Sequence, residues 1–217
     1  NGPVGCRFLE RFVTARQEAA AAQLELIDDQ PVLVFGEEPR PAYDRVHLTS
    51  YFEGQSADDL QIQSEEWYLR NGIELCTGDP VTEIDREHRL VRSQSGRVMH
   101  FESLIIATGS APFVPPVDGV GLPGVFVYRT IDDLEQIKSF GANAKSAAVL
   151  GGGLLGLEAA RALVNLGMRT HVVEKAPALM ARQLDNEAAS LLREMIERLG
   201  VETTLQRQTE RITRRGA

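Results

Sequence analysis

Apolar and polar positions in the second half of the chain follow two patterns in turn. Short apolar runs at residues 146–151, 169–175 and 201–205 predict β-strands, and stretches at 154–167 and 184–200 carry apolar residues at helical spacing. Another helix is expected after Thr130, where Asp133 lies three residues on, as in a capping box. Strands and helices that alternate with short connections predict right-handed crossovers and a parallel sheet.

The first half of the chain is less regular. A helix is expected over residues 4–23, a buried strand over 31–38, an ordered loop over 38–48 and a helix over 59–72 that stops at Asn71-Gly72. Three extended pieces follow at 73–78, 80–96 and 97–110, and Ser95-Gly96 predicts a hairpin between the last two. Residues 111–125 are rich in proline and glycine and predict a linker. The fold class is therefore α/β with two domains.

Composition narrows the classes of partner. The net charge is −8, so neither nucleic acid nor an anionic membrane is expected to bind. No apolar run has the length of a bilayer span and no signal segment is evident, which favours a cytoplasmic protein. Cys6 and Cys76 lie far apart, and the four histidines show no metal-ligand spacing, so no metal site is expected within this segment.

A glycine-rich turn joins the strand at 146–151 to the next helix. Gly151, Gly153 and Gly156 form a G-x-G-x-x-G pattern after a strand and at the start of a helix. In such a turn the glycines permit a sharp bend, a close approach to a pyrophosphate and tight helix–strand packing. The N–H groups of Leu154 and Leu155 at the helix start are then expected to hold the phosphates. The alternative is a glycine-rich turn without a ligand.

Two acidic residues accompany this turn. Glu174 ends the strand "THVVE" and is expected to accept hydrogen bonds from the ribose 2′- and 3′-hydroxyls of an adenine nucleotide. A carboxylate there repels a 2′-phosphate, so NADH is expected to bind in preference to NADPH. Glu158 is expected in the first helical turn, where it either reaches a nicotinamide or flavin edge or is a plain helix-start acid.

The chain begins with half of a second glycine turn. "NGPVG" supplies Gly2 and Gly5 of the pattern, and Pro3 is tolerated at a helix start because its missing N–H would have no helical partner. Glu37 closes the strand "PVLVFGE" and corresponds to Glu174. The first glycine and the strand before it are absent, so the chain is expected to be a fragment.

The strand end "ATGS", Ala107 to Ser110, lies just before the proline-rich stretch. Together with the two glycine turns it resembles the pyridine nucleotide-disulphide oxidoreductase-like flavoproteins, in which a first domain binds FAD and a nested second domain binds NAD(P)H. The resemblance implies an incomplete FAD domain over residues 1–116 and an incomplete NAD(P)H domain over 117–217.

The segment after the strand expected over residues 31–38 indicates the branch of this family. No cysteine lies between Arg7 and Leu75, so the thiol relay of the disulphide reductases is not expected. Ferredoxin-reductase-like members carry Pro-Tyr-x-Arg and then Leu-Ser-Lys in this region. Here Tyr43-Asp44-Arg45 is followed by Leu48-Thr49-Ser50, so Ser50 replaces the lysine near the flavin.

Four longer segments resemble the N-terminal flavoprotein part of NADH-dependent assimilatory nitrite reductase large subunits. They are "GEEPRPAYDRVHLTSYF", "ATGSAPFVPP", "VFVYRTIDDLEQI" and the stretch from Gly151 to Asp185. The resemblance implies hydride transfer from NADH to FAD, then electron transfer to iron–sulfur and sirohaem centres that lie in a downstream part and reduce nitrite to ammonium.

The resemblance also carries residue roles. Asn1, Gly2, Pro3 and Gly5 would hold the FAD pyrophosphate, Glu37 the FAD ribose, and Arg45 the phosphates or the flavin edge. Val81 would lie near the adenine, and Ala107, Thr108 and Gly109 near the flavin. Arg129 and Thr130 either touch the flavin or serve helix capping. No catalytic side chain is assigned, because the cofactors carry the reaction.

Three functions are compatible with these residues. The first is the electron-entry module of a nitrite reductase, with its acceptor in the same parent chain. The second is a stand-alone NADH-dependent reductase of a ferredoxin or rubredoxin, with a separate acceptor protein. The third is a flavoprotein that senses NADH or acts as a scaffold with little turnover.

Overall fold

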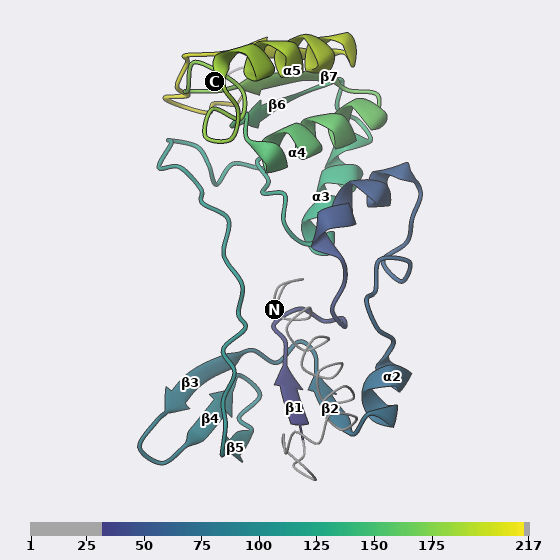
Figure 1. Cartoon of the computed structure of the whole chain (residues 1–217), viewed down its shortest axis with the longest axis vertical. Coiled ribbons are helices and arrows are strands. Elements are labelled where there is room, and N and C mark those ends of the chain that lie inside the picture. Colours follow the sequence, from purple (N-terminus) through teal and green to yellow (C-terminus); the bar gives the residue numbers. More distant parts are fainter. Residues whose placement is uncertain (1–31, 215–217) are drawn as a thin grey trace. The chain divides into compact units, whose positions relative to one another are not determined.

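The computed structural model describes residues 32–214, which form two compact α/β units (Figure 1). The first unit comprises residues 1–46 and 57–111, and the second comprises 47–56 and 112–217. The α/β class is confirmed. The expected boundary between an FAD domain and an NAD(P)H domain, at residues 116 and 117, remains a prediction, because the compactness of the units does not show which cofactor each one binds. The helix expected at 4–23 lies outside the described residues, as do Asn1, Gly2, Pro3 and Gly5.

The first unit contains a parallel pair of strands, β1 (Val32–Phe35) and β2 (Ile73–Cys76). The helix before β2, α2 (Glu65–Arg70), is shorter than expected because the Ser64 side chain caps it at residue 65, accepting a hydrogen bond from the Trp67 N–H at 3.3 Å. The expected stop after α2 is confirmed, since Gly72 has φ +66°. The parallel pair places the carboxyl ends of both strands at one edge.

An antiparallel meander of three strands follows: β3 (Val81–Asp85), β4 (Leu90–Ser93) and β5 (Val98–His100). The hairpin at Ser95-Gly96 is confirmed. The single extended piece expected over 80–96 is wrong, because it folds back between β3 and β4. The Asp85 carboxylate accepts hydrogen bonds from the backbone N–H groups of Glu87 and His88, both at 3.0 Å, and so stabilises that turn.

The strand expected to end at "ATGS" does not form in the described structure. Residues 101–110 are irregular, and Leu104, Ile105 and Ile106 are 39%, 49% and 67% exposed. A strand needs a neighbour that satisfies its backbone N–H and C=O groups. No strand among residues 32–214 pairs with this stretch, which explains why its apolar, β-branched composition is not sufficient.

The second unit is built on a parallel sheet of β6 (Ser146–Leu150), β7 (Arg169–Val173) and β8 (Val201–Thr204), in that order. Helix α4 (Leu154–Asn165) connects the first two strands and α5 (Asn186–Arg198) the last two, as predicted (Figure 1). Both helices pack into one core, whose buried members are Leu157, Ala160, Val172, Leu179 and Val201. Each such Leu or Val side chain stabilises the fold by about 1.5–3 kcal/mol.

Residues 47–56 lie in the first half of the sequence but belong to the second unit. The loop expected over 38–48 gives way to a 3-10 helix, η1 (Arg45–Glu53), after the Asp44 carboxylate accepts a hydrogen bond from the Val46 N–H at 2.8 Å. Within the second unit, Thr49 and Tyr128 share a hydrogen bond of 3.1 Å between their hydroxyl groups, and the Phe52 and Tyr128 rings stack. These side-chain contacts hold residues 47–56 to the rest of the second unit.

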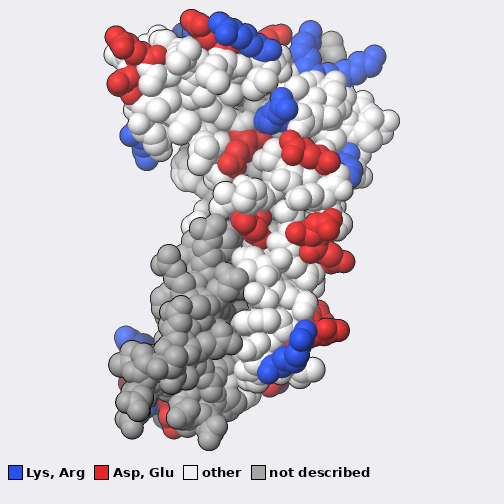
Figure 2. All heavy atoms as spheres, turned by 45° about the vertical axis from the view of Figure 1, so that its right-hand side comes forward, with Lys and Arg blue, Asp and Glu red and all other residues white. Residues whose placement is uncertain are grey.

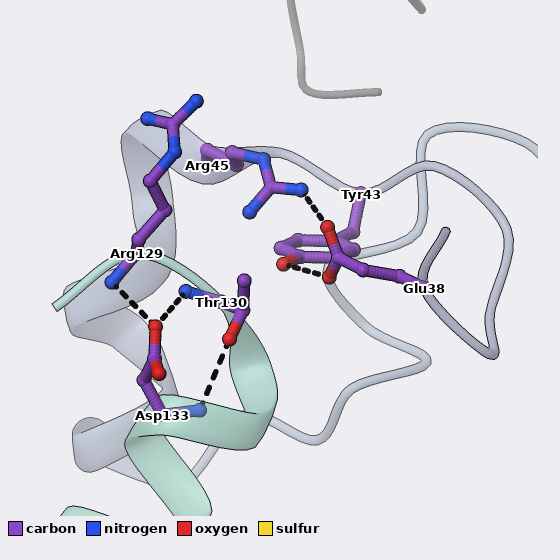
Figure 3. Close-up of polar contacts among 6 residues, drawn as sticks. All are labelled: Glu38, Tyr43, Arg45, Arg129, Thr130 and Asp133. Carbon is purple, nitrogen blue, oxygen red and sulfur yellow. Dashed lines mark hydrogen bonds and ion pairs between the residues drawn. The ribbon is translucent and has the colours of Figure 1, made fainter. Parts of the chain in front are cut away.

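Helix α3 (Ile131–Gly141) begins with the predicted capping box (Figure 3). The Asp133 N–H donates to Thr130 Oγ1 at 3.1 Å, and the Asp133 carboxylate accepts from the Thr130 N–H at 2.8 Å. The strand end expected just before this helix is not formed.

We expect Thr130→Ala to lower the melting temperature, because it removes one half of this box. Loss of such a cap costs about 1 kcal/mol, which corresponds to roughly 4–8 °C for a unit of this size. Thermal unfolding measures the change. The matched control is Ser139→Ala, an exposed position inside the same helix, which should leave the melting temperature near that of the wild type.

Candidate functional site

The turn between β6 and α4 is a preformed glycine cradle. Gly151 has φ +115°, a conformation that side-chain-bearing residues rarely adopt, and its N–H donates to the Val173 carbonyl at 2.9 Å. The chain thus bends sharply at the carboxyl end of β6 while remaining bonded to the end of β7. Nucleotide phosphates bind at this end of a parallel sheet in doubly wound folds.

The other two motif glycines differ in their surroundings. A Cβ built on Gly156 would lie 2.0 Å from the Gly151 carbonyl oxygen, so the turn closes against α4 only with glycine at this position. A Cβ built on Gly153 would meet no atom within 4 Å. Gly153 is the N-cap of α4 and has no side-chain cap, and Leu154 and Leu155 after it are exposed. Space and uncapped helix N–H groups together fit a pyrophosphate.

Glu174 lies at the end of β7, beside this turn. One carboxylate oxygen accepts a hydrogen bond from the Gly152 N–H at 2.5 Å, and the other accepts from the Ala176 N–H at 2.6 Å. A carboxylate oxygen has two lone pairs, so each can accept one more hydrogen bond. The structure therefore brings Glu174 together with the glycine turn in an arrangement that fits a ribose with two free hydroxyls.

Glu158 does not lie in the first turn of α4, contrary to expectation. The helix begins at Leu154, which places Glu158 in the second turn, where the helix dipole has little effect. Its side chain is half-buried, and burial raises the pKa of its carboxyl group. The pKa of Tyr128 is also raised by burial; the hydrogen bond with Thr49 opposes that rise and the charge of Glu158 adds to it. Glu158 is thus a partly desolvated acid of the second unit.

We expect Glu158→Gln to raise the melting temperature at about pH 7 but not at about pH 4. A carboxyl whose pKa is raised by folding favours the folded state below its ordinary pKa, and this contribution is lost as the pH rises through the raised value. The amide of glutamine is uncharged at both pH values, so the folded state does not have to bury a charge. Thermal unfolding across this pH range measures the difference, and Glu210→Gln, at an exposed position, should show no such trend.

Two of the residues expected to bind FAD belong to segments of the first unit that are hydrogen-bonded to each other. Glu37 is exposed and follows β1, and Val81 begins β3 and is 37% exposed. The backbone joins their segments, because the Asp79 N–H donates to the Gly36 carbonyl at 2.9 Å and the Gly78 N–H donates to that of Glu38 at 2.8 Å. Their location fits the expected contacts with ribose and adenine, which remain predictions.

Arg45 belongs to a compact polar cluster with Glu38 and Tyr43 (Figure 3). Its guanidinium group forms an ion pair with Glu38 and lies 4.7 Å from the centre of the Tyr43 ring. The Tyr43 hydroxyl donates to the other Glu38 oxygen at 2.6 Å, and Tyr43 is only 3% exposed. Glu38 was not identified from the sequence, although its position next to Glu37 and the Pro-x-Tyr-x-Arg spacing were available signals.

The remaining predicted flavin contacts are not assembled into a regular element. Ala107 is half-buried, Thr108 and Gly109 are exposed, and all three lie in the irregular stretch after β5. Gly109 has φ +70°, which is consistent with a turn at this point. Thr130 serves helix capping, the second of the two roles expected for it.

Sequence reasoning also passed over Gly152 and Ala176, whose N–H groups hold Glu174. The extra glycine in "GGG" was the available signal for Gly152. Nothing in the residue type marks Ala176, because its backbone N–H makes the contact.

Within residues 32–214, no helix combines the length and the apolar character needed to cross a bilayer, and no three His, Cys, Asp or Glu side chains gather as a metal site. On the face in Figure 2, acidic and basic side chains occur on each unit.

A profile of the family described as pyridine nucleotide-disulphide oxidoreductase matches residues 14–217. The nitrite reductase [NAD(P)H] large subunit of Klebsiella oxytoca is 50% identical over 99% of this chain, and the nitrite reductase (NADH) large subunit of Escherichia coli K12 is 44% identical over 100% of it. The chain spans 21% and 24% of the lengths of these two relatives.

Solved structures show the same fold. The ferredoxin reductase for the CYP199A2 system of Rhodopseudomonas palustris matches 87% of this chain and 47% of its own, with a TM-score of 0.81 and 28% identity. The family prediction is confirmed. The chain belongs to the pyridine nucleotide-disulphide oxidoreductase family.

Proposed function

We propose that this chain is the electron-entry part of an NADH-dependent nitrite reductase, and that its second unit binds NADH while its first unit contributes to an FAD site. The observation that supports the NADH site most is the glycine cradle next to a carboxylate whose two oxygens are already held by backbone N–H groups. The identity to two nitrite reductase large subunits supports the finer assignment.

The residues of the second unit have distinct roles in this proposal. Gly151, Gly153 and Gly156, with the N–H groups of Leu154 and Leu155, bind the pyrophosphate, and Glu174 binds the adenosine ribose. Glu158, a half-buried acid, is proposed to contact the nicotinamide or the flavin edge. NADH is preferred because Glu174 repels a 2′-phosphate.

The first unit contributes the FAD contacts. Bound FAD would supply the conversion of a two-electron hydride donation by NADH into single-electron transfer. The residues proposed to hold it are Asn1, Gly2, Pro3, Gly5, Glu37, Arg45, Val81, Ala107, Thr108 and Gly109. The final acceptors, iron–sulfur and sirohaem centres, are proposed for the part of the parent protein beyond this segment.

The test is anaerobic mixing of the purified full-length protein with NADH, followed by nitrite. Flavin reduction within the turnover time and NADH oxidation coupled to ammonium formation would support the proposal. Flavin reduction without nitrite turnover, but with transfer to an added ferredoxin or rubredoxin, would favour the second candidate, which the structural likeness to a ferredoxin reductase supports. Reduction too slow for turnover would contradict both and favour an NADH-sensing protein.

A further inference from the structure

Gly152 is the residue between the first two motif glycines, where the pattern accepts any residue. It is buried, and both its N–H and its carbonyl group form hydrogen bonds. Its N–H donates to Glu174 at 2.5 Å, and its carbonyl accepts from the Met180 N–H at 2.9 Å. Gly152 therefore joins the phosphate turn to the end of β7 and to the loop before α5.

The side chains of Leu179 and Glu174 fill the space around Gly152. A Cβ at this position would lie 2.6 Å from Leu179 Cδ2, and 3.2 and 3.3 Å from Cβ and Cγ of Glu174. Leu179 is fully buried, so it cannot move aside at low cost. A methyl group on residue 152 would therefore overlap Leu179 and would also push the Glu174 side chain aside by a few tenths of an ångström, whereas the backbone conformation of Gly152 gives no separate reason for glycine.

The carboxylate of Glu174 is oriented by contacts within the protein. The Gly152 and Ala176 N–H groups each hold one oxygen, and the backbone of Glu174 is itself fixed: its N–H donates to the Thr204 carbonyl at 2.9 Å, and its carbonyl accepts from the Arg207 N–H at 3.1 Å. A side chain that the protein itself holds in place loses less conformational entropy when a ligand binds to it.

We propose that Gly152 is a positioning residue that sets the preference for a free ribose over a 2′-phosphorylated one, by holding the Glu174 carboxylate toward the ribose hydroxyls. This inference rests on the proposed NADH site. Gly152 acts through Glu174 and has no contact with the reacting atoms.

The test measures binding rather than turnover. Isothermal titration of the full-length protein with ADP-ribose and with 2′-phospho-ADP-ribose gives two dissociation constants for each variant. For Gly152→Ala we expect ADP-ribose to bind about tenfold more weakly, the loss typical of a hydrogen bond to a charged group, while 2′-phospho-ADP-ribose changes by less than about twofold. The matched control is Gly121→Ala, because a Cβ there meets no atom within 4 Å and its φ is not in the left-handed region.

A double-mutant cycle with Glu174→Gln separates positioning from general damage. If Gly152 acts through the carboxylate, adding Gly152→Ala to the Gln variant should weaken ADP-ribose binding by less than about twofold more. An equal loss for both ligands, or the same loss in the Gln background, would overturn the inference. Wild-type protein without any preference for ADP-ribose would instead contradict the NADH assignment itself.

A second variant covers the case in which Gly152→Ala does not fold. Leu179→Val removes the 2.6 Å contact while the contacts of 3.2 and 3.3 Å with Glu174 remain. The pair Gly152→Ala/Leu179→Val is then compared with Leu179→Val alone. The same selective loss of ADP-ribose affinity supports the positioning role, and its absence overturns it.

Discussion

Gly156→Ala is expected to be the most destabilising single methyl addition within the phosphate turn. The new Cβ would lie 2.0 Å from a backbone oxygen, that of Gly151, and backbone cannot rotate away as a side chain can. Overpacking of this kind costs about 1–3 kcal/mol or more, so the melting temperature should fall by roughly 10 °C. Thermal unfolding of the purified protein measures the loss, and binding of ADP-ribose should be lost with it because α4 no longer closes on the turn.

Gly153→Ala is the informative comparison, because both positions belong to the same motif. A Cβ at residue 153 meets no atom within 4 Å, so unfolding should change by less than about 1 kcal/mol. ADP-ribose should still bind about tenfold more weakly if a pyrophosphate approaches this backbone. Equal melting temperatures for the two variants would contradict the packing role of Gly156, and unchanged binding by the Gly153 variant would place the pyrophosphate elsewhere.

The second unit was predictable because its signals are local. The alternation of strands and helices, the capping box at Thr130 and the glycine spacing after β6 all depend on residues within a few positions of one another. Each of these features has one low-energy outcome, such as the bend at Gly151 with φ +115°. The nearness of Glu174 to the turn followed as well, because adjacent parallel strands end at the same edge.

The failures share a different cause: the deciding partner is distant in sequence or is a backbone group. Apolar composition predicted a strand before "ATGS", but a strand forms only with a neighbour, and none is present among the described residues. Likewise, the position of Glu158 depended on where α4 begins, and helix boundaries are the least certain part of a sequence reading.

Side-chain pairing in the first unit shows the same limit. Arg45 was identified from its spacing, but its ion pair with Glu38 and its position over the Tyr43 ring depend on how the chain turns after β1. Any phosphate or flavin that binds Arg45 must therefore compete with a carboxylate already paired to it. This competition is a property of the fold and is not encoded in the motif.

Glu174→Gln is expected to have the largest effect on nucleotide choice. The amide removes the negative charge that repels a 2′-phosphate, and its NH₂ group cannot accept from the backbone N–H that faced the lost oxygen. Two effects then change the ratio of the dissociation constants for ADP-ribose and 2′-phospho-ADP-ribose in the same direction. ADP-ribose loses a charged hydrogen-bond acceptor, which costs about 10- to 100-fold, while 2′-phospho-ADP-ribose is relieved of repulsion.

We therefore expect the ratio of the two dissociation constants to shift by about a hundredfold toward the phosphorylated ligand. Titration at two salt concentrations tests the cause, because the repulsive part should shrink as salt screens it, and the hydrogen-bond part should not. Glu210→Gln removes the same charge from an exposed position in this unit and should leave the ratio unchanged. If both variants shift the ratio equally, net charge rather than the ribose contact sets the preference, and the role assigned to Glu174 is wrong.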